Sequence, residues 1–334
     1  MASFFLEFAA EQRLQLPLLV TPETCSGKTY IVTGANTGLG YETSKHLVNC
    51  RAKKVIMAVR NLEAGETAKA EIESATNNRG IAEVWSLDLS SFDSVKSFAK
   101  RVNSQLDRID AVIENASVAH DRWSTVEGYE ASTTINILST FLLAVLVLPK
   151  LTEVAKRYGN LPHLTIVTSG VAFTAKEAMD RIRDNPLAGM NDPTTTDMNK
   201  RYPLTKLFQH YAGRHLATLV PVSKTGVVVN LVNPGLCKTK LSRNSKFSRW
   251  LEIYITNLLV GRSQEMGSRP LLHASMAGAE SHGRYVSSCE IKEHQVPEWV
   301  KGEEGRKLGE RIWNDIAVEL EKIEPGCLDR VLRH

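Results

Sequence analysis

Tyr202 and Lys206 are the residues whose types and spacing best suit proton chemistry. A separation of four places two side chains on the same face of a helix, one turn apart. A phenol at its ordinary pKa of about 10 is a reluctant proton relay at neutral pH. A neighbouring ammonium group stabilises the phenolate and lowers that pKa, so the pair suits proton delivery to a carbonyl oxygen during hydride transfer.

A glycine-rich turn near the N-terminus is suited to holding a dinucleotide. The turn, Thr33-Gly34-Ala35-Asn36-Thr37-Gly38-Leu39-Gly40, follows a β-rich run and precedes a helical pattern. Glycines let the backbone turn tightly and let a pyrophosphate approach the helix N-terminus, where free N–H groups face it. Its position between the first strand and the first helix therefore predicts a dinucleotide-binding turn.

The end of the second predicted strand indicates which dinucleotide is used. An acidic residue there would bind the ribose 2′-hydroxyl and select NAD. The strand at 55–59 is followed instead by Arg60 and Asn61. A guanidinium group can pair with the 2′-phosphate of NADP, so Arg60 favours NADP(H), with a plain surface arginine as the alternative.

Apolar runs and helical patterns alternate along the chain. Strands are predicted at 28–33, 55–59, 83–87, 109–113, 164–168 and 226–232, with 285–287 as a seventh. Helices are predicted at 39–49, 63–74, 95–106, 131–154 and 203–219. Continuous apolar strands separated by helices indicate the α/β class: a Rossmann-type doubly wound parallel sheet in a single domain with N- and C-terminal extensions.

These motifs, taken in order, resemble those of the classical short-chain dehydrogenase/reductase family over roughly residues 25–290. The glycine spacing is TGxxxGxG, and Tyr202 to Lys206 is YxxxK. The other matches follow successive strands in the family's order: Asp88-Leu89, Glu114-Asn115-Ala116-Ser117, Asn136, Ser169, and Asn233-Pro234-Gly235 with Thr239.

The resemblance implies an oxidoreductase that moves a hydride between NADP(H) and a carbonyl or alcohol carbon. It implies that Lys206 also holds the nicotinamide ribose, Ser169 binds the substrate oxygen and Asn136 holds a water in the proton path. The implied cofactor-binding residues are Thr33, Gly34, Asn36, Thr37, Gly38, Leu39, Gly40, Arg60, Asp88, Leu89, Asn115, Ala116, Tyr202, Lys206, Pro234, Gly235 and Thr239.

A second YxxxK, Tyr41 to Lys45, lies in the helix directly after the glycine turn. Cofactor binding leaves no reacting carbon there, so we interpret it as a chance match.

The chain departs from the family pattern in two places. Glu114 and Ser117 replace the first Asn and the Gly of the family's NNAG, and 33 positions separate Ser169 from Tyr202. The long insert, 171–199, resembles retinol dehydrogenase-like and protochlorophyllide reductase-like members and many fungal secondary-metabolism reductases. We expect it to shape the substrate entrance, with a plain surface loop as the alternative.

The expected organisation is an arm at 1–24, the main domain at 25–290 and a C-terminal extension at 291–334 with a helix at 302–321. The main domain includes the insert and a substrate lid at 240–278. Apolar residues at 250–260 of this lid suit a bulky lipophilic substrate, or plain core packing. The apolar residues near the N-terminus suit an arm packed on the body, and a weak membrane contact is the alternative. They are Phe4, Phe5, Phe8, Leu14, Leu18 and Leu19.

The composition of the chain indicates which classes of binding partner do not suit it. The 41 basic and 37 acidic residues are interleaved, which points away from nucleic acid. The apolar stretch Phe141 to Leu148 is far shorter than the roughly 20 residues that span a bilayer, so we expect no stable membrane insertion and a cytoplasmic protein. Five cysteines without a CxxC pair indicate free thiols, and the scattered histidines predict no metal site.

The leading hypothesis is an NADP-dependent ketone or aldehyde reductase, or alcohol dehydrogenase, acting on a polyketide, terpenoid, alkaloid or retinoid-like small molecule. One alternative keeps the fold for isomerisation, dehydration or cyclisation, and another is a non-catalytic NADP sensor. The resemblance implies dimerisation through the helices at 131–154 and 203–219. The terminal extensions could instead cover those helices, so monomer and homodimer both stay open.

Overall fold

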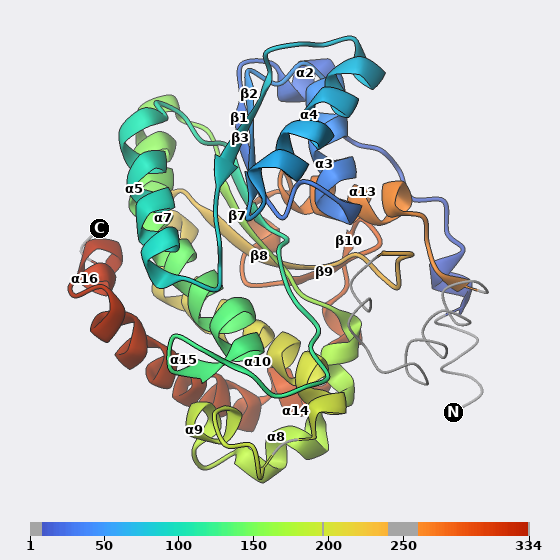
Figure 1. Cartoon of the computed structure of the whole chain (residues 1–334). Coiled ribbons are helices and arrows are strands. Elements are labelled where there is room, and N and C mark those ends of the chain that lie inside the picture. The colour runs from blue at the N-terminus through green and yellow to red at the C-terminus, as the bar shows by residue number, and fades with distance from the viewer. Residues whose placement is uncertain (1–8, 196, 240–259, 333–334) are drawn as a thin grey trace.

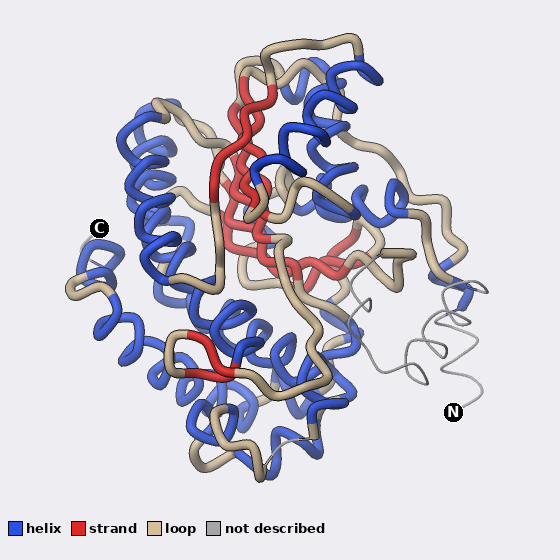
Figure 2. Tube along the Cα trace, in the orientation of Figure 1, coloured by secondary structure: helices blue, strands red, loops and turns tan. Residues whose placement is uncertain are grey.

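A parallel sheet with helices on both faces forms the centre of the molecule (Figures 1 and 2). The computed structural model describes residues 9–195, 197–239 and 260–332. The strand order is β10-β9-β8-β7-β4-β1-β2-β3, parallel except for the β9–β10 pair. The strands are β1 Thr29–Thr33, β2 Lys54–Val59, β3 Ala82–Ser86, β4 Ala111–Glu114, β7 His163–Val167, β8 Val228–Asn233, β9 Tyr285–Ser287 and β10 Glu290–Ile291. The predicted α/β class and doubly wound parallel sheet in a single domain are confirmed.

Two apolar cores lie on the two faces of the sheet, because successive strand side chains point to opposite faces. Val112 points into one core and Ile113 into the other. One face is covered by α3 Gly38–Asn49, α4 Leu62–Thr76 and α13 Gln264–Ala274. The other is covered by α5 Phe92–Gln105, α7 Ser139–Tyr158 and α10 Met198–Leu219. Residues 240–259 of the predicted lid (240–278) lie outside the described residues. The rest of the predicted lid contains α13, which packs against α3.

The helix predicted at 131–154 has three parts. It begins as α6 Ala131–Thr133, passes through the π-helical turn η1 Thr134–Leu138 and continues as α7. The span Ala131–Tyr158 is long and apolar enough to cross a membrane, although its uninterrupted apolar stretch, Phe141 to Leu148, predicts otherwise. Its most apolar 18-residue segment, however, is 94% buried inside the protein. It is therefore a core helix of this fold.

The insert before α10 is helical and packed. It forms η2 Gly170–Thr174, α8 Lys176–Ile182 and α9 Pro186–Met190, and it buries Met179, Ile182, Leu187 and Met190. The alternative of a plain surface loop is therefore wrong for these residues. α9 lies against α15 Glu303–Ile323 of the C-terminal extension (Figure 1).

Arg201 ties the insert to the rest of the fold. Its side chain is completely buried, and its Nη1 donates to the Met190 carbonyl at 2.7 Å. It also lies 3.8 Å from the Glu130 carboxylate, in the hairpin of β5 Thr125–Val126 and β6 Tyr129–Glu130. The residue directly before Tyr202 thus fixes the insert and the hairpin relative to α10.

The N-terminal arm packs on the body beside the loop after β8. Gln12 Nε2 donates to the Leu236 carbonyl at 2.8 Å, and Arg262 Nη2 donates to the Glu11 carbonyl at 2.7 Å. The Glu11 carboxylate accepts from Lys292 Nζ at 2.7 Å. The arm from residue 9 onward is therefore part of the folded domain, whereas Phe4, Phe5 and Phe8 lie outside the described residues. The prediction is wrong for Leu14, Leu18 and Leu19, which are exposed, because Gln12, Leu16 and Val20 form the buried side of the arm.

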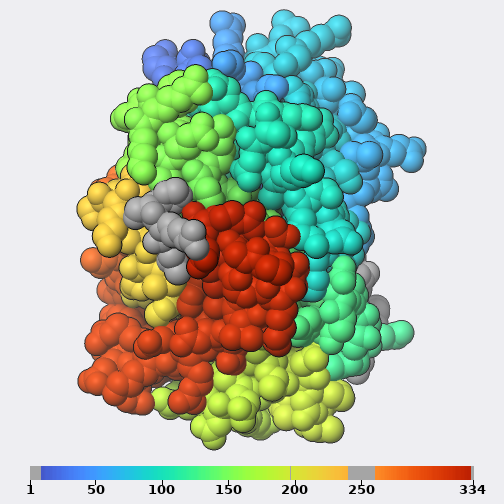
Figure 3. Space-filling model, turned by 90° about the vertical axis from the view of Figure 1, so that its left-hand side faces the viewer, coloured from blue at the N-terminus to red at the C-terminus, as the bar shows by residue number. Residues whose placement is uncertain are grey.

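The C-terminal extension covers the outer side of α10 and α7. Helix α15 lies along α10, and α16 Cys327–Leu332 lies against α7. Its buried side chains recur at helical spacing: Leu308, Ile312, Ile316 and Leu320. Trp313 meets the ring of Phe141 on α7 edge-on at 5.9 Å. Figure 3 shows the extension filling the face between the α5–α7 region and the insert.

Because α15 and α16 occupy the outer side of α7 and α10, we expect the chain to be a monomer. Among the described residues, no exposed large hydrophobic side chain lies on α7 or α10, and Val318 is the one on α15. Sedimentation equilibrium should give the mass of one chain, 37.0 kDa. A variant that ends at Gly302 uncovers both helices and should self-associate. A dimer of the full chain would contradict this prediction.

Candidate active site

The glycine turn connects β1 to α3 at the carboxyl edge of the sheet. Gly34 and Gly38 have φ values of +67° and +63°, which L side chains rarely adopt. A Cβ on Gly40 would lie 2.5 Å from the Gly34 carbonyl oxygen, so only glycine fits between the turn and the helix. Thr37 precedes the first turn of α3, and its side chain forms no capping hydrogen bond. The α3 N-terminus therefore keeps N–H groups for an anion.

A hollow of about 340 Å³ opens beside this turn. It is lined by predicted cofactor residues from four strand ends: Gly34, Asn36 and Thr37 after β1, Arg60 after β2, Asp88 and Leu89 after β3, and Ala116 after β4. The carboxyl ends of parallel strands meet at one edge of a sheet, which is where this fold class binds ligands. The structure thus brings these residues together, with Arg60 exposed at the rim.

The loop after β4 closes one side of the hollow through hydrogen bonds to β1. Asn115 Nδ2 donates to the Thr33 carbonyl at 2.9 Å, and the Ala116 N–H donates to Thr33 Oγ1 at 2.9 Å. Both residues were predicted from sequence as cofactor-binding. These bonds show that Asn115 holds the loop against the glycine turn, and its contact with the cofactor stays a prediction.

Glu114, one of the two departures from the family pattern, is buried at the end of β4. Neither of its carboxylate oxygens has a hydrogen-bond partner within the described part of the chain. Burial raises the pKa of Glu114 well above its ordinary value, which favours the neutral carboxylic acid over the carboxylate. In its neutral form this acid can donate and accept, as the amide of asparagine does.

The four predicted catalytic residues come from three elements. Asn136 lies in the π-helical turn η1, Ser169 follows β7, and Tyr202 and Lys206 lie on α10. The Asn136 side chain donates to Thr205 Oγ1 at 3.1 Å, which connects η1 directly to α10. Lys206 Nζ donates to the Val167 carbonyl at the end of β7 at 2.7 Å. A π-helical turn is common at functional sites, and here it carries Asn136.

Lys206 is almost completely buried, at 1% exposure. Burial lowers the pKa of Lys206 to about 7. Its Nζ lies 5.5 Å from the centre of the Tyr202 ring. At neutral pH the amine is therefore partly protonated, and its charge is lost as the pH rises above 7.

The Tyr202 phenol differs from the sequence-based expectation. Burial raises the pKa of Tyr202, whereas a hydrogen bond from Ser117 acts in the opposite direction. The sequence predicts that Lys206 lowers this pKa, but the ammonium is hydrogen-bonded to Val167 and the desolvation of the phenol dominates. Ser117, noted from sequence only as a departure, is thus a neighbour of the phenol.

Gln209 was missed by the sequence reasoning. Its Oε1 accepts from Lys206 Nζ at 3.0 Å, and its Nε2 donates to the Asn136 backbone carbonyl at 2.6 Å. A signal was available, because residue 209 lies three positions after Lys206 and therefore on the same helix face.

The loop after β8 carries the last predicted cofactor residues. Gly235 has a φ of +83°, and the Pro234 carbonyl accepts from Arg262 Nη1 at 3.1 Å. A methyl group of Thr239 lies 3.8 Å from the position of a Cβ on Gly38, so Thr239 reaches the glycine turn. Leu39 packs in the other direction, toward Gly267 on α13.

The second YxxxK lies apart from these residues. Tyr41 and Lys45 are on α3, on the opposite face of the sheet from α10.

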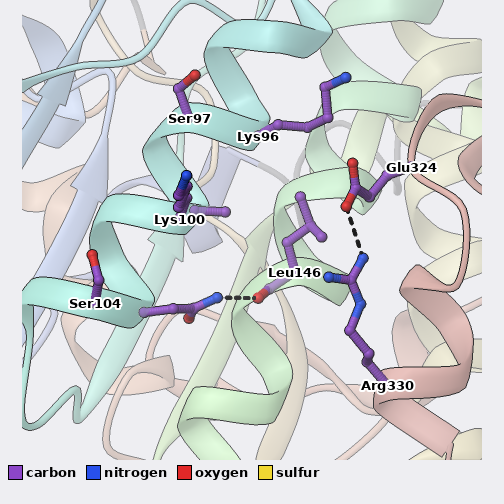
Figure 4. Close-up of a pocket in the computed structure, with 9 residues that line it drawn as sticks. Lys96, Ser97, Lys100, Ser104, Leu146, Glu324 and Arg330 are labelled. Carbon is purple, nitrogen blue, oxygen red and sulfur yellow. Dashed lines mark hydrogen bonds and ion pairs between the residues drawn. The ribbon is translucent and has the colours of Figure 1, made fainter.

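Another hollow, of about 500 Å³, lies between α5, α7 and the C-terminus (Figure 4). Lys96, Lys100, Glu324 and Arg330 line it, and Arg330 pairs with Glu324 at 2.9 Å. None of the predicted site residues lines this hollow, so we place the candidate active site at the carboxyl edge of the sheet.

Comparisons with known proteins agree with this geometry. The family profile described as short chain dehydrogenase matches residues 28–179. The short chain dehydrogenase/reductase dmxR8 of Cryptosporiopsis sp. is 40% identical over 308 residues, covering 90% of this chain and 93% of that protein. The chain belongs to the short-chain dehydrogenase/reductase family. The short chain dehydrogenase atnD of Emericella nidulans is 37% identical, covering 85% of this chain and 90% of that protein.

Solved structures share the fold of this short-chain dehydrogenase/reductase at low identity. A putative short chain dehydrogenase from Pseudomonas syringae has a TM-score of 0.63 at 18% identity, covering 82% of this chain and 100% of that chain. A short-chain dehydrogenase from Sphingobium yanoikuyae in complex with NADPH has a TM-score of 0.54 at 20% identity, covering 73% and 82%.

The residues of this short-chain dehydrogenase/reductase fit a nicotinamide dinucleotide. The left-handed Gly34 and Gly38, the free N-terminus of α3 and the hollow beside them suit a pyrophosphate. The exposed guanidinium of Arg60 at the rim suits a further phosphate.

Gly40→Ala should damage this turn in the short-chain dehydrogenase/reductase. The added Cβ would lie 2.5 Å from the Gly34 oxygen and 2.7 Å from Asn115 Nδ2, so the turn must shift. We expect the free energy of unfolding to fall by about 1–3 kcal/mol, measured by denaturant titration. Dinucleotide affinity, measured by fluorescence, should fall about tenfold or more.

Gly309→Ala on α15 is the matched control, because its nearest neighbour lies at 3.4 Å. Stability should change by at most about 1 kcal/mol and affinity should be unchanged. Equal affinities in the two variants would contradict the assignment of the turn.

Proposed function

We propose that this chain is an NADP(H)-dependent oxidoreductase that interconverts a carbonyl and an alcohol on a bulky, lipophilic small molecule. The observation that carries the proposal is the set of contacts around Tyr202 and Lys206. Ser117, which lines the hollow of the glycine turn, adjoins the Tyr202 phenol, and Lys206 is joined through Gln209 to Asn136. As substrate class we propose a secondary-metabolism ketone or aldehyde. Its support is the identity of 40% and 37% to two fungal family members and the apolar residues at 250–260.

In this proposal the protein contributes proton transfer and orientation. NADPH, when bound in the hollow, supplies the hydride. Tyr202 donates its phenolic proton to the substrate oxygen, and its raised pKa keeps that proton on the phenol at neutral pH. Lys206 in its charged form stabilises the phenolate that remains. Ser169 orients the substrate oxygen, and Asn136 connects η1 to α10 beneath the reacting groups.

The preference for NADP over NAD rests on Arg60. Its side chain stands at the end of β2, next to Asn61, which caps α4 through a 3.0 Å bond to the Ala64 N–H. A phosphate at this rim would meet both a guanidinium and a helix N-terminus. The NADPH complex of the Sphingobium yanoikuyae protein supports the same choice by similarity of fold.

Tyr202→Phe tests the catalytic assignment. The wild-type protein is mixed with NADPH and a panel of bulky ketones, aldehydes and quinones, and loss of NADPH absorbance is followed. The substitution should lower kcat by about 10²–10⁴-fold, because it removes the proton donor. NADPH affinity should change by less than about tenfold, the effect of one neutral hydrogen bond.

Tyr41→Phe, in the second YxxxK, is the matched control and should keep full turnover. Full turnover in Tyr202→Phe would overturn the assignment. If the protein binds NADPH without consuming it, and also shows no oxidation of alcohols with NADP⁺, we would instead propose non-redox chemistry or a sensor.

Arg60→Ala tests the cofactor preference. Removing the guanidinium should raise the Kd of NADPH about 10- to 100-fold, which corresponds to a charge-assisted hydrogen bond. The Kd of NADH should stay the same or fall, since NADH has no 2′-phosphate. Arg79→Ala, another exposed arginine, should change neither constant. A wild-type protein that binds NADH more tightly than NADPH would refute the preference.

A further inference from the structure

Lys206 is held in one position by two neutral oxygen acceptors. Its Nζ donates to the Val167 carbonyl at 2.7 Å and to Gln209 Oε1 at 3.0 Å. The first acceptor belongs to the backbone of β7 and cannot move without the sheet. The second is a side-chain amide, which stays in place only if its other end is fixed.

The other end of the Gln209 amide is fixed by η1. Gln209 Nε2 donates to the backbone carbonyl of Asn136 at 2.6 Å, and Gln209 is only 1% exposed. The Asn136 side chain is itself held on both sides, by the Val118 backbone at 2.8 and 2.9 Å and by Thr205 at 3.1 Å. A continuous set of hydrogen bonds therefore runs from η1 through Gln209 to the ammonium.

We propose that Gln209 is a positioning residue of this active site. Its amide joins the Lys206 ammonium to the Asn136 carbonyl and holds the ammonium beside the Tyr202 phenol. The proposal rests on the proposed function for its effect on turnover, and on geometry alone for its effect on Lys206.

Both hydrogen-bond acceptors of Lys206 are uncharged. Four elements that pack against α10, namely β8, η1, η2 and α6, carry no titratable side chain. The titratable and charged side chains of α10 itself are Lys200, Arg201, Tyr202, His210, Tyr211, Arg214 and His215. Cys237 lies near Tyr202, Tyr285 lies against His210, Glu130 pairs with Arg201, and α8 and α15 bring further charged residues to α10. Burial keeps the His210 imidazole neutral. The oxygen of Gln209 is thus one of the two groups that stabilise the ammonium.

The competing explanation is that Gln209 only satisfies buried polar groups and contributes to folding. A structural role would make all substitutions at this position harmful in proportion to the stability they remove. A positioning role predicts opposite effects from two side chains of similar size. Glutamate keeps an acceptor toward Lys206, adds a negative charge and loses the donor to the Asn136 carbonyl, whereas methionine removes both the acceptor and the donor. The two variants therefore share the loss of the bond to Asn136 and differ in the acceptor that faces Lys206.

The test compares Gln209→Met with Gln209→Glu in the full chain. The pKa of Lys206 is measured without turnover, by ¹³C NMR titration of lysine-labelled protein with Lys206→Arg for assignment. It should lie near 7 in the wild type, lower in Gln209→Met and higher in Gln209→Glu. Gln105→Met on the exposed end of α5 is the control and should leave it unchanged.

The same variants are then assayed for reduction of a substrate from the panel. Gln209→Met should lower kcat about 10- to 100-fold, and the pH above which activity declines should move down. Gln209→Glu should keep kcat within about tenfold, and that pH should move up. The pH moves because the ammonium is needed for turnover and is lost above the pKa of Lys206.

Each outcome decides a different point. Opposite pKa changes without any turnover would support the role of Gln209 while refuting the proposed reductase. Turnover with an unchanged pKa of Lys206 in both variants would overturn the role of Gln209 and leave the reductase standing. The role of Gln209 would also be overturned if both variants lost the same amount of kcat and this loss matched a lower unfolding temperature.

Discussion

The buried ammonium of Lys206 is the constraint on which the rest of the active site depends. An amine at 1% exposure loses its hydration, so its position must be enforced by hydrogen bonds from elements that cannot move independently. The Val167 carbonyl supplies one such bond from the sheet, and Gln209 supplies another that leads to η1. The site is therefore a junction of β7, α10 and η1, and the fold has to hold all three together.

The sheet edge provides the second half of the site. The glycine turn and the loop after β4 are bonded to each other through Thr33, which gives the hollow a rigid wall. The departures from the family pattern are accommodated without breaking this wall. Burial raises the pKa of Glu114 and favours its uncharged form, and Ser117 places its hydroxyl next to the Tyr202 phenol. The chemistry of the phenol thus depends on the loop after β4 as well as on its own helix.

The two terminal extensions and the insert pack around the central fold and contact the elements that carry the site. Arg201 connects the insert to α10 at the residue before Tyr202, and α15 lies along the same helix on its outer side. At the other end, the N-terminal arm binds the loop that carries Pro234 and Gly235 through Gln12 and Arg262. Segments far from the site in sequence thereby support both the catalytic helix and the cofactor loop.

The sequence by itself determined the fold class, the strand order of the main motifs and the residues at each strand end. Periodicity and motif spacing can be read from short stretches of sequence. A parallel sheet then brings the carboxyl ends of its strands together, whichever side chains lie between them. It could not determine that the insert packs on α15, that α15 covers α10, that Gln209 reaches the Asn136 carbonyl, or that Ser117 adjoins Tyr202. Those contacts join residues whose partners lie tens of positions away. Burial decided the rest, because the pKa of Lys206, Tyr202 and Glu114 depends on how much protein surrounds each group in three dimensions.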